Sequence, residues 1–208
     1  MRRIAIPALA ADGRLGFVLY VPAVAPRALV LCLHGSGERG IDLDLVEVHG
    51  LPRLIADGLE YPAVVLAPQC PEGDRWTDHL PALHTLTLAV AGEYGVDPSQ
   101  LAVTGLSLGG EGAYRLVMAY PQTFARVVPI CGPGPWHGVT PAVAAVPTWV
   151  FHGDADDVVP VDHSLELVEE IRRHGSDPRL TIYPGVGHAS WRPAYEDAEL
   201  LDWLVHGA

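Results

Sequence analysis

Short apolar runs that alternate with helix-like segments are the feature that most limits how this chain folds. From the second run onward most are apolar throughout, which is typical of strands covered on both faces. The alternation predicts an α/β fold: a mostly parallel sheet of about seven or eight strands, flanked by helices and joined by right-handed crossovers. The expected strands are 15–21, 27–33, 63–68, 101–105, 126–131, 148–153 and 179–185, and the expected helices are 51–58, 80–95, 107–120, 162–175 and 194–207. The first strands are joined too briefly for a crossover helix and are expected to form an antiparallel edge.

Composition narrows the class of protein. The chain has 208 residues, of which 49% are hydrophobic and 18% charged, so we expect one globular domain over residues 1–208. The formal net charge of -12 argues against nucleic acid and anionic membranes as partners, because both require a basic surface. No apolar stretch approaches the roughly 18 residues of a membrane span.

The cysteines indicate a reducing compartment. Cys32, Cys70 and Cys131 are odd in number and widely spaced, which is typical of free thiols in a cytoplasmic protein. The apolar segment after Met1 is interrupted by Pro7 and is too short for a secretory signal. We therefore expect a cytoplasmic location.

A glycine-rich segment, GSGERG at 35–40, follows the strand 27–33 with the spacing of a dinucleotide-binding loop. That function also requires an acidic residue at the end of the next strand, to bind a ribose. Gln69 and Cys70 follow that strand instead, so the segment does not favour a nucleotide cofactor.

The strongest chemical signal is GLSLG at 105–109, between an expected strand and an expected helix. Glycines on both sides allow the tight turn that exposes a nucleophilic Ser107 above the sheet, and the following helix directs its N-terminal N–H groups toward a developing oxyanion. A serine in this position needs a base and an acid from elsewhere in the chain. His188 follows strand 179–185, and Asp154, Asp156 and Asp157 follow strand 148–153.

The same aspartates do not have the spacing of a metal site. Their spacing lacks the glycine that a calcium loop requires at its sixth position, and the sequence contains no H-E-x-x-H or Cys/His zinc pattern. The sequence predicts neither a metal nor a cofactor.

Together, LHGSGERG, APQCPEGDRW, GLSLGG, FHGDADDVVP and VGHASW resemble the serine α/β-hydrolases of the carboxylesterase and phospholipase group. The resemblance is strongest to bacterial predicted peptidases and dienelactone-hydrolase-like esterases, and it extends from about Leu29 to His206. It implies the α/β-hydrolase fold, with Ser107 as nucleophile, His188 as base and Asp156 as the acid of a catalytic triad. It also implies an oxyanion hole formed by the backbone N–H groups of Ser36 and Leu108.

Several residues depart from the relatives. Dienelactone hydrolases proper use cysteine as nucleophile, so Ser107 argues against that activity. Acyl-protein thioesterases place glutamine after the serine, and Leu108 departs from that pattern. The short interval from Cys131 to Pro147 leaves little room for a lid, which favours an open site for small esters. Three loop tryptophans, Trp76, Trp136 and Trp191, either line the substrate pocket or pack the loops.

These features predict a serine carboxylesterase that acts on a small-molecule ester through an acyl-enzyme. Two other functions stay open from the sequence. A triad of this kind also cleaves amides, so the protein is alternatively a peptidase or amidase for short peptides. The third candidate, from another class, is a hydrolase-fold binding protein with a degenerate site.

Overall fold

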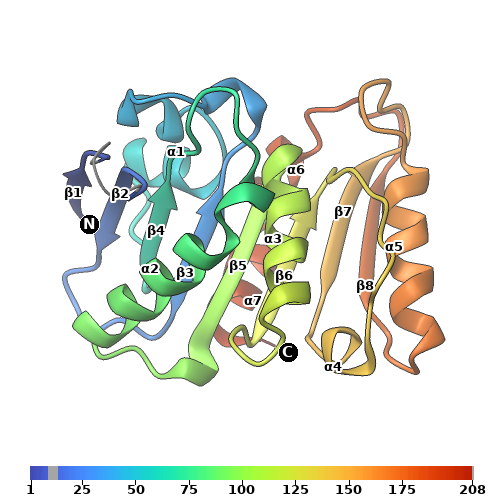
Figure 1. Ribbon diagram of the computed structural model, residues 1–208. Helices are drawn as coiled ribbons and strands as arrows, with labels where there is room; N and C mark the ends of the chain where they lie inside the picture. The colour runs from blue at the N-terminus through green and yellow to red at the C-terminus, as the bar shows by residue number, and fades with distance from the viewer. Residues whose placement is uncertain (9–13, 208) are drawn as a thin grey trace.

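The computed structural model describes residues 1–8 and 14–207, and over these residues it forms one eight-stranded sheet with helices on both faces (Figure 1). The fold agrees with the α/β class expected from the alternating pattern. The strands are β1 (Arg2–Ile6), β2 (Phe17–Val21), β3 (Leu29–Leu33), β4 (Val64–Pro68), β5 (Leu101–Leu106), β6 (Arg126–Ile130), β7 (Trp149–Gly153) and β8 (Arg179–Tyr183). The helices are α1 (Gly50–Ala56), α2 (Leu80–Glu93), α3 (Leu108–Ala119), α4 (Pro141–Ala144), α5 (Asp162–Arg173), α6 (Trp191–Glu196) and α7 (Ala198–His206).

The strand order is β1-β2-β4-β3-β5-β6-β7-β8. All neighbours from β4 to β8 pair in parallel, whereas β1 pairs with β2 and β2 pairs with β4 in antiparallel fashion. The sequence therefore predicted the antiparallel edge correctly for 15–21 but wrongly for 27–33. All five residues of β3 are buried, and this strand lies between two parallel neighbours.

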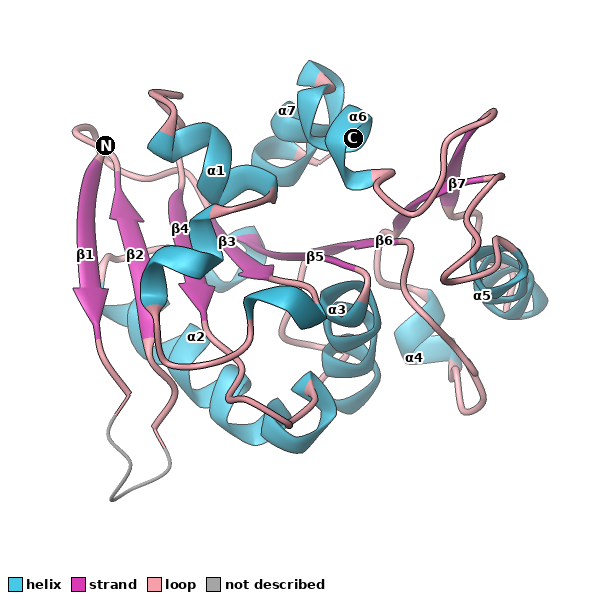
Figure 2. Ribbon diagram, turned by 90° about the horizontal axis from the view of Figure 1, so that it is seen from above, coloured by secondary structure: helices cyan, strands magenta, loops and turns pink. Residues whose placement is uncertain are grey.

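The helices form two layers, one on each face of the sheet (Figure 2). Successive residues of a strand point to opposite faces, so Leu31 packs into the core under α2, α3 and α5, while Val30 packs into the core under α1, α6 and α7. This two-sided burial explains why the central strands are apolar throughout.

The expected helix 194–207 is divided in two. Asp197 has extended backbone angles, φ -77° and ψ 113°, and its side chain accepts a hydrogen bond from the amide of Glu199. It therefore caps the start of α7 and ends α6 before it. Among the described residues, no helix is both long enough and apolar enough to cross a membrane.

The topology brings four loops to one edge of the sheet. The loops that follow β3, β5, β7 and β8 lie along the upper edge in Figure 1. Since carboxyl ends of parallel strands share an edge, residues far apart in the sequence meet there. In the segment between β6 and β7, the structure places only the four-residue α4, at the opposite end of the sheet.

Candidate active site

Ser107 stands on a sharp turn between β5 and α3. Its backbone angles, φ 53° and ψ -117°, lie in a region that residues other than glycine rarely occupy. Its amide donates a hydrogen bond to the Ile130 carbonyl at 2.9 Å. A Cβ atom on Gly109 would overlap the Leu33 carbonyl oxygen and lie 2.7 Å from that of His34. The glycine therefore allows the turn to pack directly on the end of β3, and the backbone itself fixes Ser107.

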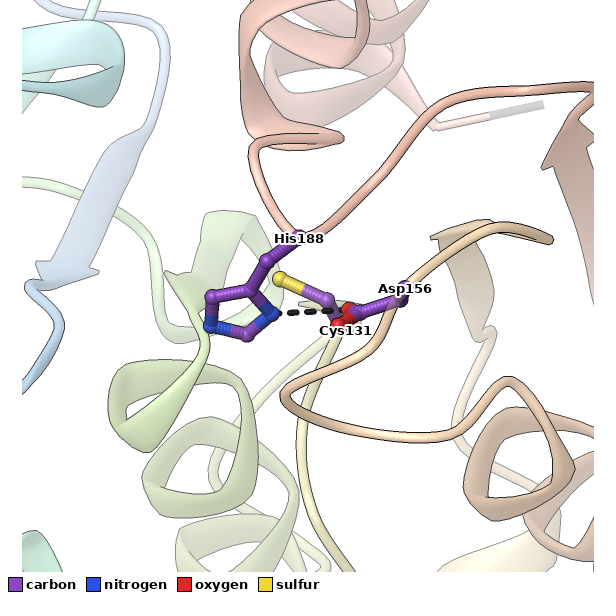
Figure 3. Close-up of side chains that lie close together, drawn as sticks. All are labelled: Cys131, Asp156 and His188. Carbon is purple, nitrogen blue, oxygen red and sulfur yellow. Dashed lines mark hydrogen bonds and ion pairs between the residues drawn. The ribbon is translucent and has the colours of Figure 1, made fainter.

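A continuous hydrogen-bonded chain connects three side chains from three loops. His188 Nε2 lies 2.9 Å from Ser107 Oγ, and His188 Nδ1 lies 2.7 Å from Asp156 Oδ2, the contact drawn in Figure 3. A carboxylate only accepts, so Nδ1 carries the proton and Nε2 is the acceptor for the serine hydroxyl. This is the arrangement in which a histidine removes a proton from serine.

The Asp156 carboxylate is buried but fully hydrogen-bonded. Its Oδ1 accepts from the amides of Val158 and Val159, each at 2.9 Å. Burial raises the pKa of Asp156, but the hydrogen bonds from His188 and the two amides outweigh it, so that pKa lies below its usual value. The side chain is thus held as an anion facing His188.

The two neighbouring aspartates lie elsewhere. Asp154 is exposed, and its Oδ1 accepts from the Gly185 amide at 2.6 Å, which connects the loop after β7 to the turn after β8. Asp157 is exposed. Of the three candidates, the structure brings Asp156 to His188.

Ser36 and Leu108, the two expected oxyanion donors, each open a helical segment. Ser36 is the first residue of a short 3-10 helix, Ser36–Glu38, and Leu108 is the first residue of α3. N–H groups in the first turn of a helix have no acceptor within that helix, so both are available to a substrate oxygen. The structure thus places each donor where its N–H is free of intrahelical bonds.

His34 orients the first of these donors. Its Nε2 accepts from the Cys70 amide at 3.0 Å, so its Nδ1 carries the proton and donates to the Gly35 carbonyl at 2.6 Å. In a trans peptide the carbonyl and the next N–H point in opposite directions, so this bond also directs the Ser36 N–H. Burial lowers the pKa of His34 to about 4, against the opposing effect of the Gly35 carbonyl, and keeps the ring neutral.

The three tryptophans have different positions. Trp76 is fully buried, donates from Nε1 to the His34 carbonyl at 2.9 Å, and packs on Gly112 of α3. Trp136 is also buried and donates to the His163 carbonyl at 2.6 Å. These two pack against the backbone of neighbouring segments. Trp191 is half-buried, packs edge-on against His188 with ring centres 5.3 Å apart, and lines a cavity of about 220 Å³.

Cys131 lies beside Asp156 and His188. Its Sγ, an Asp156 oxygen and a His188 nitrogen are within 4.8 Å of one another (Figure 3). Both nitrogens of His188 and both oxygens of Asp156 already hold hydrogen bonds. Burial raises the pKa of the Cys131 thiol to about 12, so the thiol keeps its proton. This donor set fits a catalytic hydrogen-bond chain and does not fit a metal ion.

The sequence did not point to three residues that support the site from behind, His34, Gln69 and His152. His34 and Trp76 orient the loop of Ser36, and Gln69 Nε2 donates to the carbonyls of Glu38 and Asp42 in the same loop. His152 contacts Asp156 from within β7. The one available signal was a polar side chain inside an otherwise apolar strand or at its end.

Comparisons with known proteins identify the family of this chain. A sequence model of the dienelactone hydrolase family matches residues 76–199. A Yersinia pestis protein provisionally named a carboxymethylenebutenolidase is 29% identical in an alignment of 143 residues, and the match covers 56% of this chain and 51% of that protein. A protein of Oryza sativa subsp. japonica provisionally named a carboxylesterase is 27% identical over 188 residues, covering 76% of this chain and 80% of its own.

Solved structures of esterases share the fold of this chain. The crystal structure of a thermostable esterase superposes with a TM-score of 0.82 and 32% identity, covering 97% of this chain and 62% of that one. Esterase PE8 superposes with a TM-score of 0.62 and 25% identity, covering 91% and 95%. The chain spans about half the length of the Yersinia protein and under two thirds of the thermostable esterase. It has the α/β-hydrolase fold, and because the family match covers more than half of its residues, this protein belongs to the dienelactone hydrolase family.

Proposed function

We propose that this protein is a serine carboxylesterase. The observation that carries the proposal is the unbroken chain from Ser107 Oγ through the His188 ring to the Asp156 carboxylate, with contacts of 2.9 and 2.7 Å. The esterase names of the relatives and of the similar structures support it.

The reaction proceeds in two halves. Ser107 Oγ forms a bond to the ester carbonyl carbon while His188 Nε2 takes the hydroxyl proton, and Asp156 stabilises the imidazolium. The carbonyl electron pair moves to the oxygen, which the N–H groups of Ser36 and Leu108 stabilise. The tetrahedral intermediate then expels the alcohol, which takes the proton from His188. Water repeats the steps on the acyl-enzyme and releases the acid.

The surroundings of the triad favour a small substrate. The segment between β6 and β7 contributes no lid helix over Ser107, because its one helix, α4, lies at the opposite end of the sheet. The chemistry needs no cofactor, because all groups that move protons or stabilise charge come from the chain. We further propose a cytoplasmic location, which the free and buried thiols of Cys32, Cys70 and Cys131 support.

Removing the nucleophile tests the proposal. Ser107→Ala should lower kcat for a short-chain aryl ester by about 10⁶-fold, as in other serine triads, because no other group can form the acyl-enzyme. A fluorophosphonate probe should label the native protein and fail to label the variant. Substantial turnover by the folded variant would overturn the proposal.

A matched pair of substrates separates an esterase from a peptidase. An acetyl ester and the anilide of the same acid present the same acyl group to Ser107. The proposed function requires faster cleavage of the ester, and faster anilide cleavage would favour the peptidase. If the folded native protein does not react with the probe, the site is degenerate and the protein a binding module.

A further inference from the structure

His152 is a fully buried histidine directly behind the triad. It lies in β7, four residues before Asp156, and its side chain has no exposed surface. Its Nε2 lies 3.1 Å from Asp156 Oδ2 and 2.9 Å from the Val159 carbonyl. Its Nδ1 lies 2.6 Å from the hydroxyl of Ser164 in α5. Both ring nitrogens are therefore bonded.

These contacts fix the protonation of the ring. The carboxylate and the carbonyl are both acceptors, so Nε2 carries a proton and shares it between them. Burial lowers the pKa of His152, although the Val159 carbonyl and Asp156 oppose this effect. The ring is therefore neutral, and Nδ1 is the acceptor for the Ser164 hydroxyl proton.

The same Asp156 oxygen thus receives two imidazole N–H groups. His188 Nδ1 approaches Oδ2 at 2.7 Å from the substrate side, and His152 approaches it at 3.1 Å from the core. The other oxygen is held by the Val158 and Val159 amides. The His152 N–H prevents rotation of the carboxylate and offsets part of its charge, so the proton taken from Ser107 stays on His188.

We propose that His152 is a positioning residue for the acid of the triad, held in its active tautomer by Ser164. The proposal rests on the proposed esterase function, in which Asp156 orients His188. His152 acts only through Asp156 and does not touch the substrate. Its loss should therefore change the rate of the chemical step, kcat, and leave KM nearly unchanged.

The test compares two substitutions at one position. His152→Leu removes the N–H donor and fills the same space with an apolar side chain. It should lower kcat by about 10- to 100-fold, the loss expected when a catalytic group is displaced by up to about 1 Å from its productive position. His152→Gln offers an amide N–H near the original Nε2 and should restore much of that loss. Ser164→Ala should lower kcat by a few-fold.

A control and a titration keep the test decisive. His84 lies on α2, away from the site, and its side chain bonds to Thr123 at 2.9 Å. The control variant His84→Leu should leave kcat unchanged. Each kcat is divided by the fraction of protein that reacts with the fluorophosphonate probe, so unfolded protein does not count. An unchanged kcat in folded His152→Leu, or equal losses in the Leu and Gln variants, would overturn the proposal. If His152→Leu does not fold, an unchanged kcat in Ser164→Ala would do so.

The outcome is independent of the parent proposal. Turnover that persists in Ser107→Ala would refute the esterase mechanism whatever the His152 variants do. Turnover that requires Ser107 but is insensitive to His152 would refute only the positioning role.

Discussion

Ser107, the proposed nucleophile, and its two partner side chains are held in place by different means. Ser107 is fixed by backbone: a positive φ of 53°, an amide bond to Ile130, and a glycine packed on the end of β3. Asp156 and His188 lie on loops after β7 and β8 and are held by hydrogen bonds of their side chains. They bond to each other, and the Asp156 carboxylate also accepts from His152 and from the amides of Val158 and Val159.

The difference predicts how each half responds to change. A backbone turn packed without space cannot accept even one additional carbon atom. A hydrogen-bonded side chain can accept a substitute that donates or accepts at the same place. The nucleophile half should therefore be sensitive to volume, and the acid and base half to protonation and donor chemistry.

The largest expected effect is that of Gly109→Ala. The new Cβ would overlap the Leu33 carbonyl oxygen, so either β5 and α3 separate from β3 or the protein does not fold. We expect the free energy of unfolding to fall by more than about 4 kcal/mol, the range of severe core substitutions, and activity to be lost. Chemical denaturation and probe labelling measure the two effects.

Gly92→Ala is the matched control. Gly92 lies in α2, and a Cβ atom there would meet no heavy atom within 4 Å. Alanine favours helix over glycine by up to about 1 kcal/mol, so this variant should be as stable as the native protein or more so. Comparable stability of the two alanine variants would contradict the conclusion that the backbone fixes the turn at Ser107.

The same contrast explains which parts of the molecule the sequence predicted. The Gly105–Gly109 turn is encoded locally, because the residues that make its geometry possible are adjacent to Ser107. The buried parallel strands were equally visible, since burial on both faces makes them apolar throughout. The fold class and the turn at Ser107 could therefore be predicted from short segments of the sequence.

Long-range supports were not readable in this way. The Trp76 indole binds the carbonyl of His34, 42 residues earlier in the chain, and Ser164 binds His152 across a loop. A tryptophan in a loop or a histidine in a strand has many possible partners, and only the fold selects one. The edge strand β1 was missed because four of its five residues are exposed, so its sequence lacks a strong apolar pattern.

The next largest effect concerns Ser36, the proposed oxyanion donor in the loop after β3. Ser36→Pro removes the N–H, and the position tolerates proline, because it is the first residue of a helical turn and Gly35 before it is extended with φ -78° and ψ -172°. We expect kcat to fall by about 10²- to 10³-fold, the usual cost of one oxyanion donor. Steady-state kinetics on an aryl ester measures it.

Ser36→Ala serves as the control for this donor. It keeps the N–H and removes only the hydroxyl, so its kcat should stay near that of the native protein. A large loss in the alanine variant would show that the hydroxyl matters, and a native rate in the proline variant would remove Ser36 from the oxyanion hole.

The smallest expected effect is a loss of folding stability in acid, caused by the buried rings of His34 and His152. Burial lowers the pKa of His34 to about 4, and it also lowers that of His152. The unfolded chain binds protons on these rings below about pH 6.5. The folded protein does not bind them until lower pH, so the stabilisation is complete above pH 6.5 and is lost as the pH falls toward 4. From pH 7 to pH 5, His34 alone should lower the free energy of unfolding by about 2 kcal/mol.

Urea denaturation at pH 7 and pH 5 measures this loss, and two histidine variants assign it. His34→Gln removes the titrating ring but keeps an amide that can bond to the Gly35 carbonyl or the Cys70 amide, so the free energies at the two pH values should differ less than in the native protein. His174→Gln replaces an exposed histidine and should retain the full native difference. If the free energies of unfolding at pH 7 and pH 5 differ as much in His34→Gln as in the native protein, protonation of His34 is not the cause of the acid sensitivity.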